Sequence, residues 1–199
     1  MDIHAPNGPI SSWREVFTHL GIVTVGILIA LSLEGCVEWK HHRDLAKEAH
    51  ENLTAEIRDN RTELENSIRQ LPGTEKQVRA IIDHIDAVDT EKKKSDSIEL
   101  RYSFDDAHLA NASWTTAQTT GALSFMKYDD VKKFSAVYDL QREYVDLQRD
   151  LISRIIDSND FGKGKNGLDT AREHVSAVDR SMQGLEQVGK ALDDEYKKF

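Results

Sequence analysis

The chain has 199 residues, a net charge of −9 and a single cysteine, and 31% of its residues are charged whereas 3 are proline and 11 are glycine. The acidic balance disfavours a nucleic-acid partner, and one cysteine excludes an intramolecular disulfide and a cysteine-based metal site. The low proline and glycine content favours an all-α protein built from long helices.

An apolar segment near the N-terminus is long enough to cross a membrane as a helix. Between Val16 and Val37 only His19 and Glu34 are ionisable, and a helix of this length extends about 33 Å, against about 30 Å for the hydrocarbon core of a bilayer. A cleaved signal peptide and a buried core helix are the alternatives, but the segment lacks both a small-residue cleavage site and a polar face. We predict an N-terminal tail (1–15), a transmembrane helix (16–39) and a helical bundle domain (40–199).

Two features of this segment concern its surroundings in the membrane. Trp13 and Trp39 bracket it, and tryptophan favours the membrane interface because its ring is apolar and its N–H is polar. Gly26, Ala30 and Glu34 follow at steps of four and therefore share one face of the helix. Small residues at this spacing let a second helix approach closely. We predict helix packing through this face, with a protein partner or with a second copy.

The residues after the span predict two helices separated by a break. Pro72-Gly73 is a strong stop signal, and Thr74 is placed to cap the helix that follows. The first helix has a narrow apolar stripe at steps of three and four, formed by Leu45, Ala49, Leu53, Ile57, Asn60, Leu64, Ile68 and Leu71. The second helix places Val78, Ile81, Ile82, Ile85 and Val88 on one face.

The remainder of the chain predicts three further helices. A short one begins at Ser113 as its N-cap, a long one runs from Asp129 or Asp130 to about residue 158, and the last begins near Leu168 after a loop at 161–167. The fold class is therefore all-α, with one N-terminal transmembrane helix continuing into an antiparallel bundle of about four to five helices. A long coiled-coil oligomer is the competing interpretation.

Two stretches resemble recurring segments of a group of uncharacterised bacterial single-pass membrane proteins. Residues 26–43, GILIALSLEGCVEWKHHR, are similar to their anchor, in which a Gly-Ile-Leu-Ile-Ala-Leu core precedes Glu, Val-Glu, an aromatic or histidine cluster and a charged helix. Residues 113–123, SWTTAQTTGAL, are similar to their second segment. The resemblance implies a membrane-tethered helical domain of unknown function, and it carries no catalytic residues.

The side of the membrane on which the domain lies stays open. Arg14 precedes the span whereas Lys40, Arg43 and Lys47 follow it, which favours a cytoplasmic domain by the positive-inside rule. The group that the chain resembles often has a more basic N-terminus, which implies a periplasmic domain. We therefore predict a single-pass protein of the bacterial inner membrane. The flanking charges favour a cytoplasmic helical domain, whereas the resemblance favours a periplasmic one.

The sequence predicts no catalytic residues, no cofactor and no metal. Glu38-x-x-His41 has the spacing of a di-iron ligand pair, but such a site needs a second pair and two further glutamates on facing helices. The most distinctive polar stretch surrounds Trp114, Gln118 and Gly121, which are candidate residues for contact with a ligand or partner. A tight helix crossing that requires small residues is the alternative interpretation of this stretch.

These features favour a non-enzymatic, membrane-anchored interaction protein. It would be an accessory or scaffold subunit of a membrane assembly, or a homo-oligomer, whose partners are the lipid bilayer and a protein. The alternative is a membrane-tethered ligand-binding or sensory bundle, because helical bundles bind small molecules between their helices.

Overall fold

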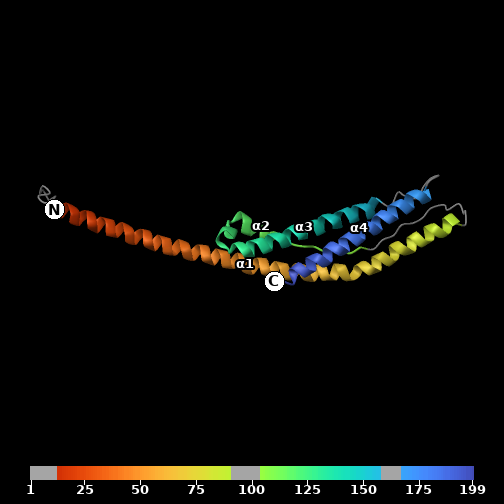
Figure 1. Cartoon of the computed structure of the whole chain (residues 1–199), viewed down its shortest axis with the longest axis horizontal. Coiled ribbons are helices and arrows are strands. Elements are labelled where there is room, and N and C mark those ends of the chain that lie inside the picture. The colour runs from red at the N-terminus through yellow and green to blue at the C-terminus, as the bar shows by residue number, and fades with distance from the viewer. Residues whose placement is uncertain (1–12, 91–103, 158–166) are drawn as a thin grey trace, which may run out of the picture.

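The computed structural model describes residues 13–90, 104–157 and 167–199, and these residues confirm the all-helical class. Figure 1 shows an elongated molecule in which α3 and α4 lie beside the C-terminal half of α1 while its N-terminal half projects alone. The helices are α1 (Trp13–Thr90), α2 (Ala112–Thr119), the 3₁₀ helix η1 (Ala122–Phe125), α3 (Tyr128–Asp157) and α4 (Gly167–Tyr196).

Helix α1 has two parts with different surroundings. Between Trp13 and His41 every described side chain is exposed, whereas from Ala49 onward the helix buries a residue at steps of three and four. The predicted stripe is confirmed, and Ser67 and Thr74 belong to it as well. The buried members are Ala49, Leu53, Ile57, Asn60, Leu64, Ser67, Leu71, Thr74, Val78 and Ile85.

The predicted break at Pro72-Gly73 is wrong, because α1 continues through both residues. A proline inside a helix removes one hydrogen bond and costs about 3 kcal/mol. Here Pro72 and Gly73 are exposed, while Leu71 before them and Val78 after them are buried on the same face. Each buried side chain of this size contributes about 1.5–3 kcal/mol, so burial along an unbroken stripe outweighs the cost of the proline. Thr74 is consequently a buried interior residue and does not cap a second helix.

The bundle has three long helices, and α4 packs along both of the others. In Figure 1 the chain direction of α4 is opposite to that of α1 and α3, which confirms antiparallel packing for α3 and α4. Helices α1 and α3 run in the same direction, since the hairpin expected at residue 72 does not exist. The predicted loop at 161–167, apart from Gly167, and the side chain of Val88 lie outside the described residues.

Residues 104–111 are not helical and pack between α1 and α3, where side-chain amides satisfy their backbone. Asn60 Nδ2 donates to the carbonyl of Ala110 at 2.7 Å, and the amide N–H of Ala110 donates back to Asn60 Oδ1 at 2.8 Å. Gln148 makes the same two bonds with Ala107, at 3.0 and 3.1 Å. Because an unpaired buried backbone group is costly, these amides hold the connecting segment in place.

The short helix begins earlier than predicted, and a separate 3₁₀ helix follows it. Asn111 occupies the N-cap position, so Ser113 lies inside α2. Gly121 has φ of 74°, a left-handed conformation that favours glycine, and it separates α2 from η1. Phe125, the last residue of η1, is 43% exposed.

Candidate functional site

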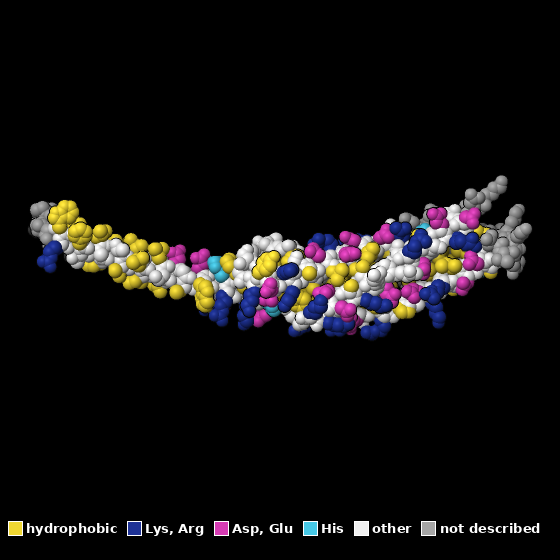
Figure 2. Space-filling view, viewed as in Figure 1, with side chains coloured by type: hydrophobic (Ala, Val, Ile, Leu, Met, Phe, Trp, Pro, Cys, Tyr) yellow, Lys and Arg dark blue, Asp and Glu magenta, His cyan; other side chains and the backbone are white. Residues whose placement is uncertain are grey.

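The projecting part of α1 presents an apolar surface with few free polar groups. The hydroxyl groups of Thr18, Thr24 and Ser32 each donate to the carbonyl four residues earlier, at 2.8, 2.7 and 2.7 Å. These bonds satisfy the hydroxyls within the helix, as a lipid environment requires. Figure 2 shows hydrophobic side chains along this part, whereas charged side chains gather over the bundle. Helix α1 is long and apolar enough to cross a membrane, and its most apolar window buries no residue.

The residues predicted for packing in the membrane lie on this projecting part. Gly26, Ala30 and Glu34 are all exposed, and a Cβ placed on Gly26 would meet no atom within 4 Å. No described helix of this chain covers their face. The helix–helix association predicted for them therefore stays a prediction about a second molecule.

Trp13 and Trp39 lie at the two ends of the apolar part and are exposed. They are 26 positions apart in one helix, which corresponds to about 39 Å along its axis. A bilayer with its headgroups is about 40–45 Å thick, so the separation fits two rings at opposite interfaces. The guanidinium of Arg43 lies 5.5 Å from the ring centroid of Trp39, and this cation–π contact brings a positive charge to one end of the apolar part.

The bundle begins directly beyond Trp39. The imidazole of His42 stacks on the ring of Phe125, with 3.8 Å between centroids and 10° between planes. This contact joins α1 to η1 at the end of the bundle nearest to the apolar part, as the position of α2 and the following turn in Figure 1 shows. The stack fixes the turn after α2 against α1.

Trp114, one of the predicted contact residues, packs in the core and also lines the cleft described below. Its ring stacks on that of Tyr138 with 5.2 Å between centroids. The Tyr138 hydroxyl donates to Glu56 Oε1 at 2.7 Å, and the backbone N–H of Ser113 donates to Glu56 Oε2 at 2.8 Å. Burial, together with the hydrogen bond to Glu56, raises the pKa of Tyr138 far above its ordinary value. Tyr138 therefore stays protonated and holds α2 to α1 and α3.

The other two predicted contact residues, Gln118 and Gly121, do not belong to the buried core. Gln118 is exposed, and Gly121 has open space around it, so its left-handed φ and not a close approach accounts for the glycine. The hydroxyl groups of Thr119 and Thr120 donate to carbonyls of α2 itself. These two hydroxyls are consequently satisfied within the helix.

A cleft of about 310 Å³ lies between residues 109–114 and α3, beside the stacked pair of Trp114 and Tyr138. It contains the guanidinium groups of Arg142 and Arg149, which pair with aspartates one turn earlier on α3. Aromatic rings and guanidinium groups are suited to a planar ligand, and the paired aspartates offset the charge of the two arginines. The cleft is lined by Leu109, Asn111, Trp114, Tyr138, Gln141, Arg142, Val145, Asp146 and Arg149.

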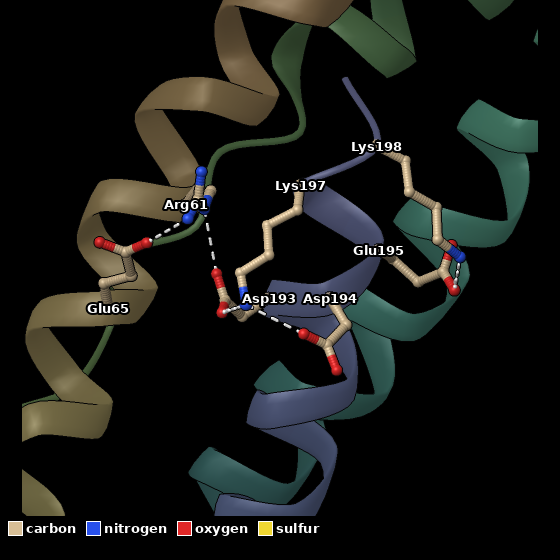
Figure 3. Close-up of polar contacts among 7 residues, drawn as sticks. All are labelled: Arg61, Glu65, Asp193, Asp194, Glu195, Lys197 and Lys198. Atoms are coloured by element: carbon tan, nitrogen blue, oxygen red, sulfur yellow. Dashed lines mark hydrogen bonds and ion pairs between the residues drawn. The ribbon is translucent and has the colours of Figure 1, made fainter.

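An ion-pair network joins the end of α4 to α1 (Figure 3). Asp193 accepts from Arg61 Nε at 3.0 Å and pairs with Lys197 Nζ at 2.6 Å. Partial burial by itself would raise the pKa of Asp193, but the hydrogen bonds and charges of Lys197 and Arg61 outweigh it, so this pKa lies below its usual value. Arg61 also pairs with Glu65 at 2.7 Å. A groove of about 570 Å³ beside this network carries both charge signs and selects no ligand class.

Within the described residues, no group of three His, Cys, Asp or Glu side chains is close enough to hold a metal ion. The sequence paired Glu38 with His41, but the histidine that approaches Glu38 is His42, with Nε2 3.9 Å from Oε1. The ring of His42 is stacked on Phe125. Asp105-x-x-His108 has a spacing similar to that of Glu38-x-x-His41, but it lies in a non-helical segment.

Comparison with protein-family models, with curated proteins and with solved structures finds no match to this chain. The resemblance of residues 26–43 and 113–123 to bacterial single-pass proteins therefore stays a prediction.

Proposed function

We propose that this chain is a non-enzymatic, membrane-anchored interaction protein. It acts as an accessory or scaffold subunit of a membrane assembly, or as a homo-oligomer, in the bacterial inner membrane. The observation that supports this most directly is the division of α1 into two parts. Every described side chain between Trp13 and His41 is exposed, whereas from Ala49 to Val78 about one side chain per turn is buried. An exposed apolar helix of this length requires lipid or another protein around it.

The face with Gly26, Ala30 and Glu34 is the proposed contact for the partner helix. Side chains are small at the first two positions, so a neighbouring backbone can approach closely. An ionisable residue in a span normally faces another helix or a polar environment, which gives Glu34 a reason to lie on the same face.

The test is a pull-down of the full-length protein from native membranes in mild detergent, with bound proteins identified by mass spectrometry. We expect a stoichiometric partner, or a second copy detected by cross-linking, and its loss in Gly26→Leu and Ala30→Leu. The control is Gly35→Leu, because Gly35 has the same open surroundings and lies about 180° around the helix from Gly26. Assembly that survives in all three variants would exclude this face as the contact.

A second candidate function is the binding of a small ligand, and the cleft beside Trp114 is the observation that favours it. Its volume of about 310 Å³ falls at the lower end of ligand-binding pockets. A thermal-shift screen of the full-length protein against a metabolite panel tests this function, with Arg142→Ala and Arg149→Ala as variants. A ligand that stabilises the wild type and both variants equally does not bind in the cleft.

A further inference from the structure

We propose that the turn between η1 and α3, which carries Phe125 and Tyr128, rests on the headgroup layer of the membrane that α1 spans. This inference depends on the proposed membrane anchor and adds a second lipid contact to it. The turn lies at the end of the bundle nearest to the apolar part of α1 (Figure 1). The surface that the turn contacts would thus be the same bilayer.

The height of the turn above the membrane follows from the geometry of α1. The ring of Phe125 stacks on His42, and His42 is three residues beyond Trp39, which corresponds to about 4.5 Å along the helix. The headgroup region on each side of a bilayer is about 5–8 Å thick. With the two tryptophans placed symmetrically about a hydrocarbon core of about 30 Å, His42 lies about 9 Å beyond the edge of the hydrocarbon, so Phe125 lies at the outer boundary of the headgroup layer. Because α1 has no break between Trp39 and His42, this height is set by a rigid helix.

The exposed side chains of the turn suit this position. Tyr128 is 80% exposed and Phe125 is 43% exposed, although the bundle has a core that could have buried them. A tyrosine favours the membrane interface because its ring is apolar and its hydroxyl is polar. The ring of Phe125 stacks on His42 and the side chain remains partly exposed, so an apolar surface remains at the same height.

Charge does not carry this contact. Between residues 125 and 133 the chain has three lysines and two aspartates, which leaves a difference of one positive charge. Attraction to anionic lipid is therefore weak, and the aromatic rings provide the affinity. We expect the contact to form on zwitterionic phosphatidylcholine and to change little with salt.

The experiment measures the accessibility of nitroxide labels in the full-length protein reconstituted into phosphatidylcholine nanodiscs. Cys36 is replaced by alanine, and a single cysteine is introduced in turn at Leu28, at Tyr128 and at Ser153, all of which are exposed. Collision rates with oxygen, which partitions into lipid, and with a water-soluble nickel chelate are compared. We expect the label at position 128 to collide severalfold less with the nickel chelate, and more with oxygen, than the label at 153.

Each other outcome has a defined meaning. If the label at 128 has the same collision rates as the label at 153 while the label at 28 is in lipid, the second contact is overturned and the anchor stays intact. A label at 128 that is shielded from both reagents means that protein covers the turn, which also overturns the proposal. A label at 28 that is open to the nickel chelate overturns the anchor itself.

Discussion

Gly189 offers a sharp test of the packing between the three long helices. It is buried in α4, and a Cβ at this position would lie 2.9 Å from Cε2 of Tyr144 and 3.1 Å from Cδ1 of Ile68. Tyr144 is fully buried on α3 and Ile68 lies on α1, so the glycine is the point where all three helices meet. We expect Gly189→Ala to destabilise the bundle.

The magnitude follows from two opposing contributions. Alanine is better than glycine inside a helix by about 1 kcal/mol, whereas an extra methyl group in a filled core costs about 1–3 kcal/mol. The end of Ile68 can rotate away, but the ring of Tyr144 has no free space around it. The net effect is a loss of up to about 2 kcal/mol. Gly184→Ala is the matched control, because Gly184 lies in α4 with no atom within 4 Å of its added Cβ.

The assay is thermal unfolding of the full-length variants in detergent, followed by circular dichroism at the helical band. The helix-propensity gain cancels between the two variants, so their difference reports the packing cost of about 1–3 kcal/mol. This difference corresponds to roughly 2–4 °C in Tm per kcal/mol for a domain of this size. Equal shifts in the two variants would refute the close packing of α1, α3 and α4 at Gly189.

Three further substitutions test the polar contacts. Asn60→Ala removes the acceptor of the Ala110 N–H, whereas Gln141 still donates to the Ala110 carbonyl, so we expect a loss of about 1 kcal/mol in the free energy of unfolding measured with urea. Tyr138→Phe removes the donor to one carboxylate oxygen of Glu56 and should cost a similar amount, whereas an unchanged urea midpoint would contradict this contact. The lowered pKa of Asp193 means that its stabilisation is complete above about pH 4 and is lost as the pH falls through that pKa; Asp193→Asn should flatten the acid side of the stability–pH profile.

Periodicity predicted most of the core, and local stop signals predicted the connections less well. The stripe from Ala49 to Leu71 packs in the core as expected, because a repeat of three and four residues specifies one face wherever the helix packs. The predicted break at Pro72 was wrong because the local cost of a proline in a helix is outweighed by the burial of side chains before and after it. That comparison depends on α4, whose position the sequence of α1 does not contain.

The contacts of the candidate sites were harder to predict because their partners are distant in the chain. Asn60 and Gln141 share Ala110 as a partner, 50 and 31 residues away. A signal was present in the sequence: Asn60 occupies a position in an otherwise apolar stripe, and Gln141 and Gln148 are seven residues apart on one face of α3. Buried amides at such positions indicate a non-helical neighbour that needs hydrogen bonds, but they do not identify which segment supplies it.

Because one helix forms both the proposed span and the first helix of the bundle, the directions of their faces are coupled. Ala49 faces α2 and η1 at the near end of the bundle. Counting about 100° per residue back from Ala49 places Ala30 about 100° and Gly26 about 140° around the helix from this end of the bundle. Two copies packed through Gly26 and Ala30 would therefore hold their bundles on outer sides, where they do not collide. Cysteine cross-links are then expected at Gly26 but not at Ser153 on α3, and efficient cross-linking at position 153 would mean that the copies meet through their bundles.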